Sequence, residues 1–164
     1  MAARRLSRTI SAQQRTDARS AHQAAVALLA RRDFAGGELA AKLTARGFDP
    51  GVARKVVTEL GEQGVLDDGR FAINYVAFHA ARGQGPLRIS ALLRAAGVDQ
   101  ALAEAALADG TDWLALARRA RAARFGPQVP VKWEERARQA RFLQYRGFSA
   151  DHIRAATGAD PDTD

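Results

Sequence analysis

The chain of 164 residues carries a formal net charge of +7, and 47% of its residues are hydrophobic. This hydrophobic content is enough to bury a core and excludes a wholly disordered chain. The absence of cysteine excludes disulfide bridges and thiolate metal sites. No secretory signal and no apolar run of ~20 residues occurs, so we expect a cytoplasmic protein that does not enter a membrane.

The positive charge is concentrated in two parts of the chain. Residues 1–19 contribute +4, residues 20–110 are neutral, residues 111–146 contribute +6, and residues 147–164 contribute −3. A clustered basic region is the usual electrostatic footprint of a protein that binds nucleic acid or an acidic partner. We therefore expect a nucleic-acid-associated role, with a merely solubilising role of the arginines as the alternative.

All predicted elements are helices, because alanine, leucine, arginine and glutamate dominate and no alternating strand pattern occurs. Residues 1–19 are polar and are expected to form a flexible basic tail. Three three-helix repeats are expected over residues 20–65, 66–110 and 111–157, followed by an acidic tail over residues 158–164. The sequence thus predicts an all-α protein with about nine helices, arranged as an elongated array.

The first repeat is expected to contain helices over residues 18–31 and 37–46 and a third helix that begins at Pro50. Gly47 should end the second helix with a positive φ, a conformation that glycine accepts readily. Asp49 is expected to cap the third helix, because its carboxylate can accept the free N–H groups of the first turn.

The second and third repeats follow the same pattern. Gly97 and Gly147 follow Gly47 at intervals of fifty residues, and each is expected to separate the second and third helices of its repeat. In the third repeat we expect helices over residues 112–125 and 132–146. One three-helix unit exposes too much apolar surface to be robust alone, so neighbouring units should stack.

The sequence offers no catalytic constellation, so we expect neither an enzyme nor a metal or cofactor site. Its histidines are too far apart for a helical metal pair, and a nucleophile elbow is absent. Asp67 and Asp68 could bind a divalent ion, but helix capping is the favoured interpretation. Residues 82–88, "RGQGPLR", lack the lysine and hydroxyl of a phosphate-binding loop and are expected to link two helices, although their arginines could contact a phosphate or a carboxylate.

The candidate partner-binding residues lie on two consecutive basic helices of the third repeat. Several arginines of the second repeat are further candidates. The candidates are Arg70, Arg82, Arg88, Arg94, Arg118, Arg119, Arg121, Arg124, Lys132, Arg136, Arg138 and Arg141. Those of the third repeat are expected at solvated positions. Trp113 and Trp133 could stack on bases, but core anchoring is the favoured interpretation.

Several motifs together resemble the RecX regulators of bacterial recombination over residues 24–156. They are "LLARRDFAGGELAAKLTARGF", "GVLDDGRFAINYV", "GQGPLRISALLRAAGV" and "RFLQYRGFSADHI". Leu92 departs from the pattern, since the family usually has glutamate there. The arginine-rich N-terminal segment also lies outside the shared pattern.

The resemblance implies a non-enzymatic, all-helical protein that binds the filament of the RecA recombinase. It implies modulation, usually inhibition, of ATP hydrolysis, strand exchange and co-protease activity by RecA. We expect a monomer whose basic third repeat contacts DNA in the filament. A stand-alone helical DNA-binding protein is the alternative, because short helical units with basic helices can enter a major groove.

Overall fold

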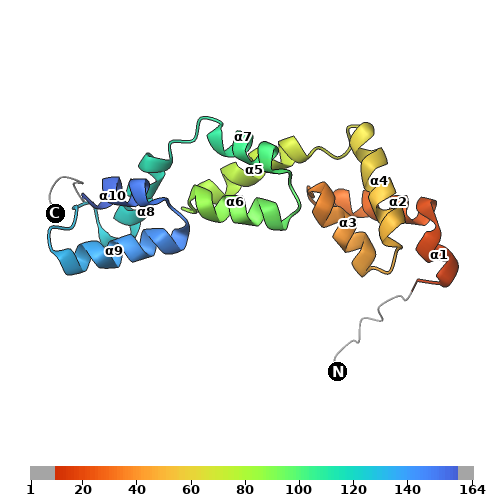
Figure 1. The fold of residues 1–164 in the computed structure, drawn as a ribbon, viewed down its shortest axis with the longest axis horizontal. Helices are drawn as coiled ribbons and strands as arrows, with labels where there is room; N and C mark the ends of the chain where they lie inside the picture. Colours follow the sequence, from red (N-terminus) through yellow and green to blue (C-terminus); the bar gives the residue numbers. More distant parts are fainter. Residues whose placement is uncertain (1–9, 159–164) are drawn as a thin grey trace, which may run out of the picture. The chain divides into compact units, whose positions relative to one another are not determined.

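The computed structural model describes residues 10–158, which form ten helices and no strand (Figure 1). The helices are α1 (Ala12–Thr16), α2 (Ala18–Leu29), α3 (Gly36–Ala45), α4 (Pro50–Glu62), α5 (Asp68–Ala80), α6 (Pro86–Ala95), α7 (Gln100–Ala108), α8 (Trp113–Phe125), α9 (Trp133–Arg146) and α10 (Ala150–Thr157). The all-α prediction is confirmed. The described chain divides into unit 1, which runs to Phe71 and includes Ala96–Val98, and unit 2, which contains the rest.

The helix that the sequence analysis did not predict is α1, which lies within the segment expected to form a flexible tail. Ser11 and Gln14 form a capping box at its start, and Ile10 packs against the core of unit 1. The tail prediction is therefore wrong for residues 10–19, and the remainder of that segment lies outside the described residues. Apolar periodicity could not detect α1, because its only contribution to the core comes from the single isoleucine beside it.

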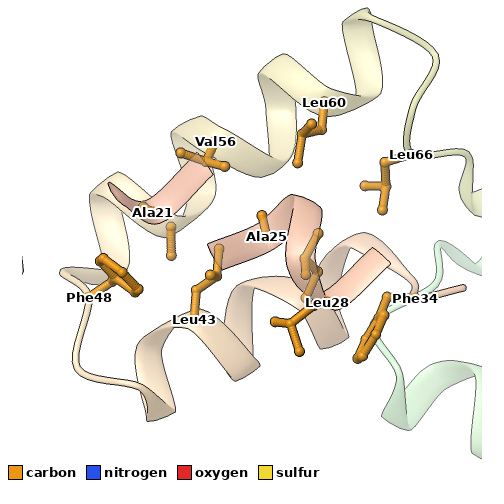
Figure 2. Packing of buried hydrophobic residues seen from close by; sticks show 11 residues of the cluster. Ala21, Ala25, Leu28, Phe34, Leu43, Phe48, Val56, Leu60 and Leu66 are labelled. Atoms are coloured by element: carbon orange, nitrogen blue, oxygen red, sulfur yellow. The ribbon is translucent and has the colours of Figure 1, made fainter. Parts of the chain in front are cut away.

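The core of unit 1 is formed mainly by α2, α3 and α4 (Figure 2). Its buried side chains recur three or four positions apart along each helix, which places them on one face. They include Ala21, Ala25, Leu28, Leu39, Leu43, Ala53, Val56 and Leu60, with Phe34, Phe48 and Leu66 from the connecting segments. The small alanines of α2 allow the neighbouring helices to approach closely.

The turn between α3 and α4 has the predicted construction. Gly47 adopts a φ of +99°, which confirms the expected left-handed turn. The Asp49 carboxylate accepts a hydrogen bond from the backbone N–H of Gly51 at 2.8 Å and so caps α4, with Pro50 in the first turn. Phe48 lies between the two helices in sequence, and its burial in the core fixes the turn against both helices.

The two adjacent aspartates before and at the start of α5 have structural roles. Asp67 accepts a hydrogen bond from the backbone N–H of Arg70 at 2.9 Å, as capping predicts. Asp68 accepts one from the N–H of Gly36 at 2.7 Å and thereby ties the start of α5 to the start of α3. Among the described residues, no group of three or more histidine, cysteine, aspartate or glutamate side chains could hold a metal ion.

In unit 2, α8, α9 and α10 pack around a small core of Ala117, Leu143, Phe148 and Ala156. The segment after α5 links it to α6, as predicted, and also contacts the turn between α9 and α10. The N–H of Gly85 donates to the carbonyl of Arg146 at 2.8 Å, and that of Leu87 to the carbonyl of Gly147 at 3.0 Å. These bonds join the second and third repeats. No helix among the described residues is long and apolar enough to span a membrane.

Candidate anion-binding groove

A groove of about 370 Å³ in unit 2 brings together four arginines from two helices and a turn. Arg82 follows α5, Arg119 and Arg124 lie on α8, and Arg146 ends α9. Leu116 and Phe142 supply apolar surface, and the residues that line the groove include no carboxylate. We call this feature the unit 2 groove.

The sequence of α8 explains why a groove forms there. The side chain of Asp112 caps α8 by accepting a hydrogen bond from the N–H of Ala115 at 2.9 Å. Ala120 and Ala123 lie between the two groove arginines of α8 and line the groove. Their methyl side chains leave space that larger residues would fill, so the long arginines on either side form walls.

Arg82 and Arg146 are held in place by neutral groups. Arg146 Nη1 donates a hydrogen bond to the backbone carbonyl of Arg82 at 3.1 Å, and its guanidinium carbon lies 5.2 Å from the centre of the Phe142 ring. The guanidinium of Arg82 stacks 3.4 Å from the ring centre of Phe78. Carbonyls and aromatic rings orient a guanidinium but carry no full negative charge, so the positive charge of both arginines remains available.

Within the described part of the chain, none of the four groove arginines forms an ion pair. A guanidinium presents donors in a planar fork that matches the two oxygens of a carboxylate or phosphate. Four such groups around an apolar floor therefore favour an oxyanion, particularly one whose neighbouring groups can cover Leu116 and Phe142.

The structure brings three of the twelve predicted residues together in the unit 2 groove, namely Arg82, Arg119 and Arg124. Seven others are exposed but lie outside it: Arg70, Arg88, Arg94, Arg118, Lys132, Arg138 and Arg141. Arg138 is paired with Glu135 at 3.0 Å, and Arg88 donates to the carbonyl of Tyr145 at 3.4 Å. Arg136 is half-buried, and its Nε has no hydrogen-bond partner among the described residues.

The prediction of a solvated Arg121 is wrong, because its side chain is buried and the residue is only 4% exposed. Its Nη1 donates to the carbonyl of Gln128 at 2.7 Å and to Gln139 Oε1 at 3.3 Å, and its Nη2 donates to the carbonyl of Pro127 at 3.0 Å. The carbonyls at and after a helix end carry partial negative charge that offsets the buried cation. Arg121 therefore organises the loop between α8 and α9.

The prediction of two core tryptophans is wrong for Trp133, which is 75% exposed at the first position of α9. Its neighbour Val131 is 87% exposed, so this edge of the third repeat lacks a covering element among the described residues. Trp113 is half-buried, and its Nε1 donates to the carbonyl of Leu107 at 3.0 Å, which ties α8 to the end of α7.

Arg146 is the groove residue that sequence reasoning missed. A signal for it exists in the repeated Arg-Gly-Phe of residues 46–48 and 146–148. The repetition marks the arginine as part of a turn that occurs twice in the chain. The glycine and the phenylalanine are enough to explain the turn structurally, so the motif alone does not indicate a binding role for the arginine. The contact with Arg82 arises only when the second and third repeats pack together.

Comparison with known proteins gives a consistent result. Models of the first, second and third three-helix domains of RecX match residues 21–60, 67–107 and 111–157. The chain is 49% identical over 142 residues to Regulatory protein RecX of Halorhodospira halophila, covering 86% of this chain and 88% of that protein. It is 42% identical over 140 residues to the protein of the same name from Xanthomonas oryzae pv. oryzae, covering 85% and 88%.

A solved structure shares the fold. The crystal structure of RecX from Lactobacillus salivarius superposes with a TM-score of 0.73 at 21% sequence identity, over 90% of this chain and 97% of that chain. Together with the matches to the three domain models, this similarity confirms the predicted organisation in three three-helix repeats.

Proposed function

Since the chain belongs to the RecX family, we propose that it is a non-enzymatic regulator that binds the filament formed by the RecA recombinase on DNA. In this proposal it lowers ATP hydrolysis, strand exchange and co-protease activity by RecA. The observation that carries the proposal is the unit 2 groove, whose four arginines lack ion-pair partners within the described residues and surround an apolar floor.

An acidic segment of RecA is the favoured occupant of the unit 2 groove. Leu116 and Phe142 are only half-buried, so they offer apolar surface that a phosphate backbone would leave uncovered. A protein segment can place carboxylates against the arginines and apolar side chains against this floor. Buried interface arginines are frequent hot spots for such contacts.

The test is inhibition of DNA-dependent ATP hydrolysis by RecA. The double variant Arg119→Ala/Arg124→Ala should require about 10-fold more protein for half-inhibition, because truncating charged partners inside an interface costs more than truncating them at the rim. The matched control is Arg118→Ala/Arg141→Ala, which removes the same charge from exposed positions outside the groove on α8 and α9.

Equal inhibition by the groove variant and the wild type would remove the unit 2 groove from the interface. Equal loss in both double variants would show that total charge matters and that the groove does not. A third result, in which wild-type protein binds bare DNA as tightly as RecA-coated DNA, would favour the alternative of a stand-alone DNA-binding protein. Circular dichroism of each variant checks that the helices are intact.

A further inference from the structure

A second basic groove lies in unit 1, in the part of the chain whose summed charge is zero. It has a volume of about 520 Å³ and is lined by residues at and after the end of α2 and by the C-terminal part of α3. Its cationic residues are Arg31, Arg32, Lys42 and Arg46, and Leu28 and Phe34 form its floor. We call this feature the unit 1 groove.

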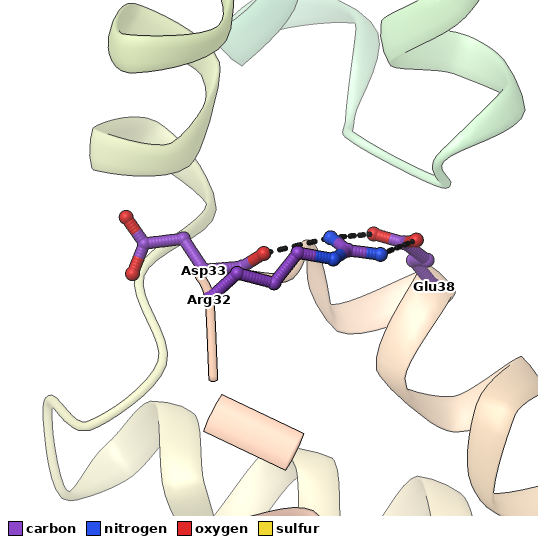
Figure 3. Close-up of polar contacts among 3 residues, drawn as sticks. All are labelled: Arg32, Asp33 and Glu38. Carbon is purple, nitrogen blue, oxygen red and sulfur yellow. Dashed lines mark hydrogen bonds and ion pairs between the residues drawn. The ribbon is translucent and has the colours of Figure 1, made fainter. Parts of the chain in front are cut away.

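Arg32 lines the unit 1 groove, and neighbouring residues hold its side chain in place (Figure 3). Its Nη2 contacts Glu38 Oε1 at 2.5 Å, and its Nη1 donates to the backbone carbonyl of Asp33 at 2.8 Å. Its guanidinium carbon also lies 3.7 Å from the centre of the Phe34 ring. The carboxylate of Asp33 points away from this pair. Arg32 is therefore neutralised and held in place by its neighbours.

The three remaining cations of the groove, Arg31, Lys42 and Arg46, are exposed. None of them forms an ion pair within residues 10–158. Lys42 and Arg46 are four residues apart, so they share one face of α3 and lie about one turn, ~6 Å, apart along its axis. Leu39 and Leu43 lie beside them on the helix and are buried in the core, whereas the side chains of Lys42 and Arg46 remain exposed at its edge.

The floor of this groove argues against an acidic protein segment. Leu28 is 7% exposed and Phe34 is 5% exposed, so neither of these two side chains is open to a contact with an anchoring side chain of a partner. Protein interfaces gain most of their affinity from such anchors. A nucleic acid backbone needs only cations, since its binding is driven by the release of counterions from phosphates.

We propose that the unit 1 groove binds the phosphodiester backbone of a nucleic acid through Arg31, Lys42 and Arg46. This site is separate from the proposed RecA contact in unit 2, and it can be tested on DNA without RecA. The contacts are to phosphate, so binding should be independent of base sequence and should weaken steeply with salt.

The experiment measures binding of the full chain to a labelled DNA duplex and to a single strand, each of about 40 nucleotides, as a function of salt. Lys42→Ala/Arg46→Ala should lower the slope of log affinity against log salt by roughly 1.8 on the duplex and roughly 1.4 on the single strand. The matched control is Arg54→Ala/Lys55→Ala, which removes two exposed charges from α4 outside the groove and should keep the wild-type slope.

A charge-conserving exchange, Lys42→Arg/Arg46→Lys, should keep most of the wild-type slope of log affinity against log salt. This result would show that the lower slope of the alanine variant comes from the loss of charge. The proposal is overturned if the groove variant and the α4 control lower the slope equally, because the binding would then be diffuse. It is also overturned if the groove variant binds bare DNA like the wild type but no longer inhibits RecA, which would assign the groove to an acidic protein. Urea unfolding confirms that each variant is folded.

Discussion

At the residue scale, the buried guanidinium of Arg121 is the clearest test of how the third repeat is held together. Arg121→Met keeps much of the side-chain length but removes the donors to the loop carbonyls and to Gln139. We expect the free energy of unfolding to fall by about 2 kcal/mol, because buried acceptors lose their partners. Urea unfolding followed by circular dichroism measures the loss.

The control for this prediction is Arg118→Met, at an exposed position of the same helix. It should change the free energy of unfolding by at most about 0.5 kcal/mol. If the two methionine variants were equally stable, water would be replacing Arg121 as the partner of the loop carbonyls, and the arginine would not be organising the loop.

The arginines of α8 show what sequence could and could not predict about single residues. Arg118, Arg119 and Arg124 are exposed as expected, whereas Arg121 is buried. Composition cannot separate them, because arginines at these positions project from several faces of one helix. The distinction depends on which face α9 covers, and only the packed structure supplies that information.

At the element scale, the turn between α9 and α10 requires glycine at position 147 for two reasons, its backbone conformation and its close contact with Arg88. Gly147 adopts a φ of +90°, and a Cβ placed on it would lie 2.6 Å from the backbone nitrogen of Arg88. Gly147→Ala should therefore lower the free energy of unfolding by about 3 kcal/mol, since the cost of overpacking adds to that of the positive φ. Denaturant titration measures the change.

Gly110 provides the control, because it also has a positive φ, +70°, but a Cβ there would meet no atom within 4 Å. Gly110→Ala should lower the free energy of unfolding by about 1 kcal/mol, because only the positive φ opposes the substitution. An equal cost at both positions would mean that the second and third repeats separate easily enough to admit the methyl group.

Element boundaries were largely predictable, because they depend on local chemistry. The cap at Asp49 and the glycines at 47 and 147 act within a few residues of themselves, and the structure confirms each of them. The contact of Gly85 with the turn at Gly147 was not predictable, since it joins segments far apart in the sequence. The groove arginines Arg82 and Arg146 meet through this same contact.

At the scale of the whole molecule, summed charge misled the interpretation of residues 20–110, which include the unit 1 groove. The segment is neutral overall, yet several of its carboxylates act as backbone acceptors: Asp49 caps α4, Asp67 caps α5, and Asp68 binds the N–H of Gly36. None of these three acids lines the unit 1 groove. The cations there consequently keep a local excess of positive charge that a count along the sequence cannot show.

The two grooves give the whole chain two different kinds of contact, one proposed for DNA and one for RecA. Two sites joined by one chain raise the affinity for a target that carries both ligands, because the second contact forms at a high effective concentration. Such a protein would prefer RecA-coated DNA to either component alone, without any new contact.

The assignment of one groove to DNA and the other to RecA predicts how each variant binds three targets, namely bare DNA, RecA without DNA and RecA-coated DNA. Lys42→Ala/Arg46→Ala should weaken binding to bare DNA and to RecA-coated DNA, but not to RecA without DNA. Arg119→Ala/Arg124→Ala should weaken binding to RecA and to RecA-coated DNA, but not to bare DNA. The affinity of each variant for RecA-coated DNA should fall about 10-fold or more, because the gain from two simultaneous contacts is lost when either groove no longer binds. Fluorescence anisotropy of labelled protein on each target measures these affinities. If both variants weakened binding to the same single component, the grooves would serve one ligand, and the preference for the filament would need another origin.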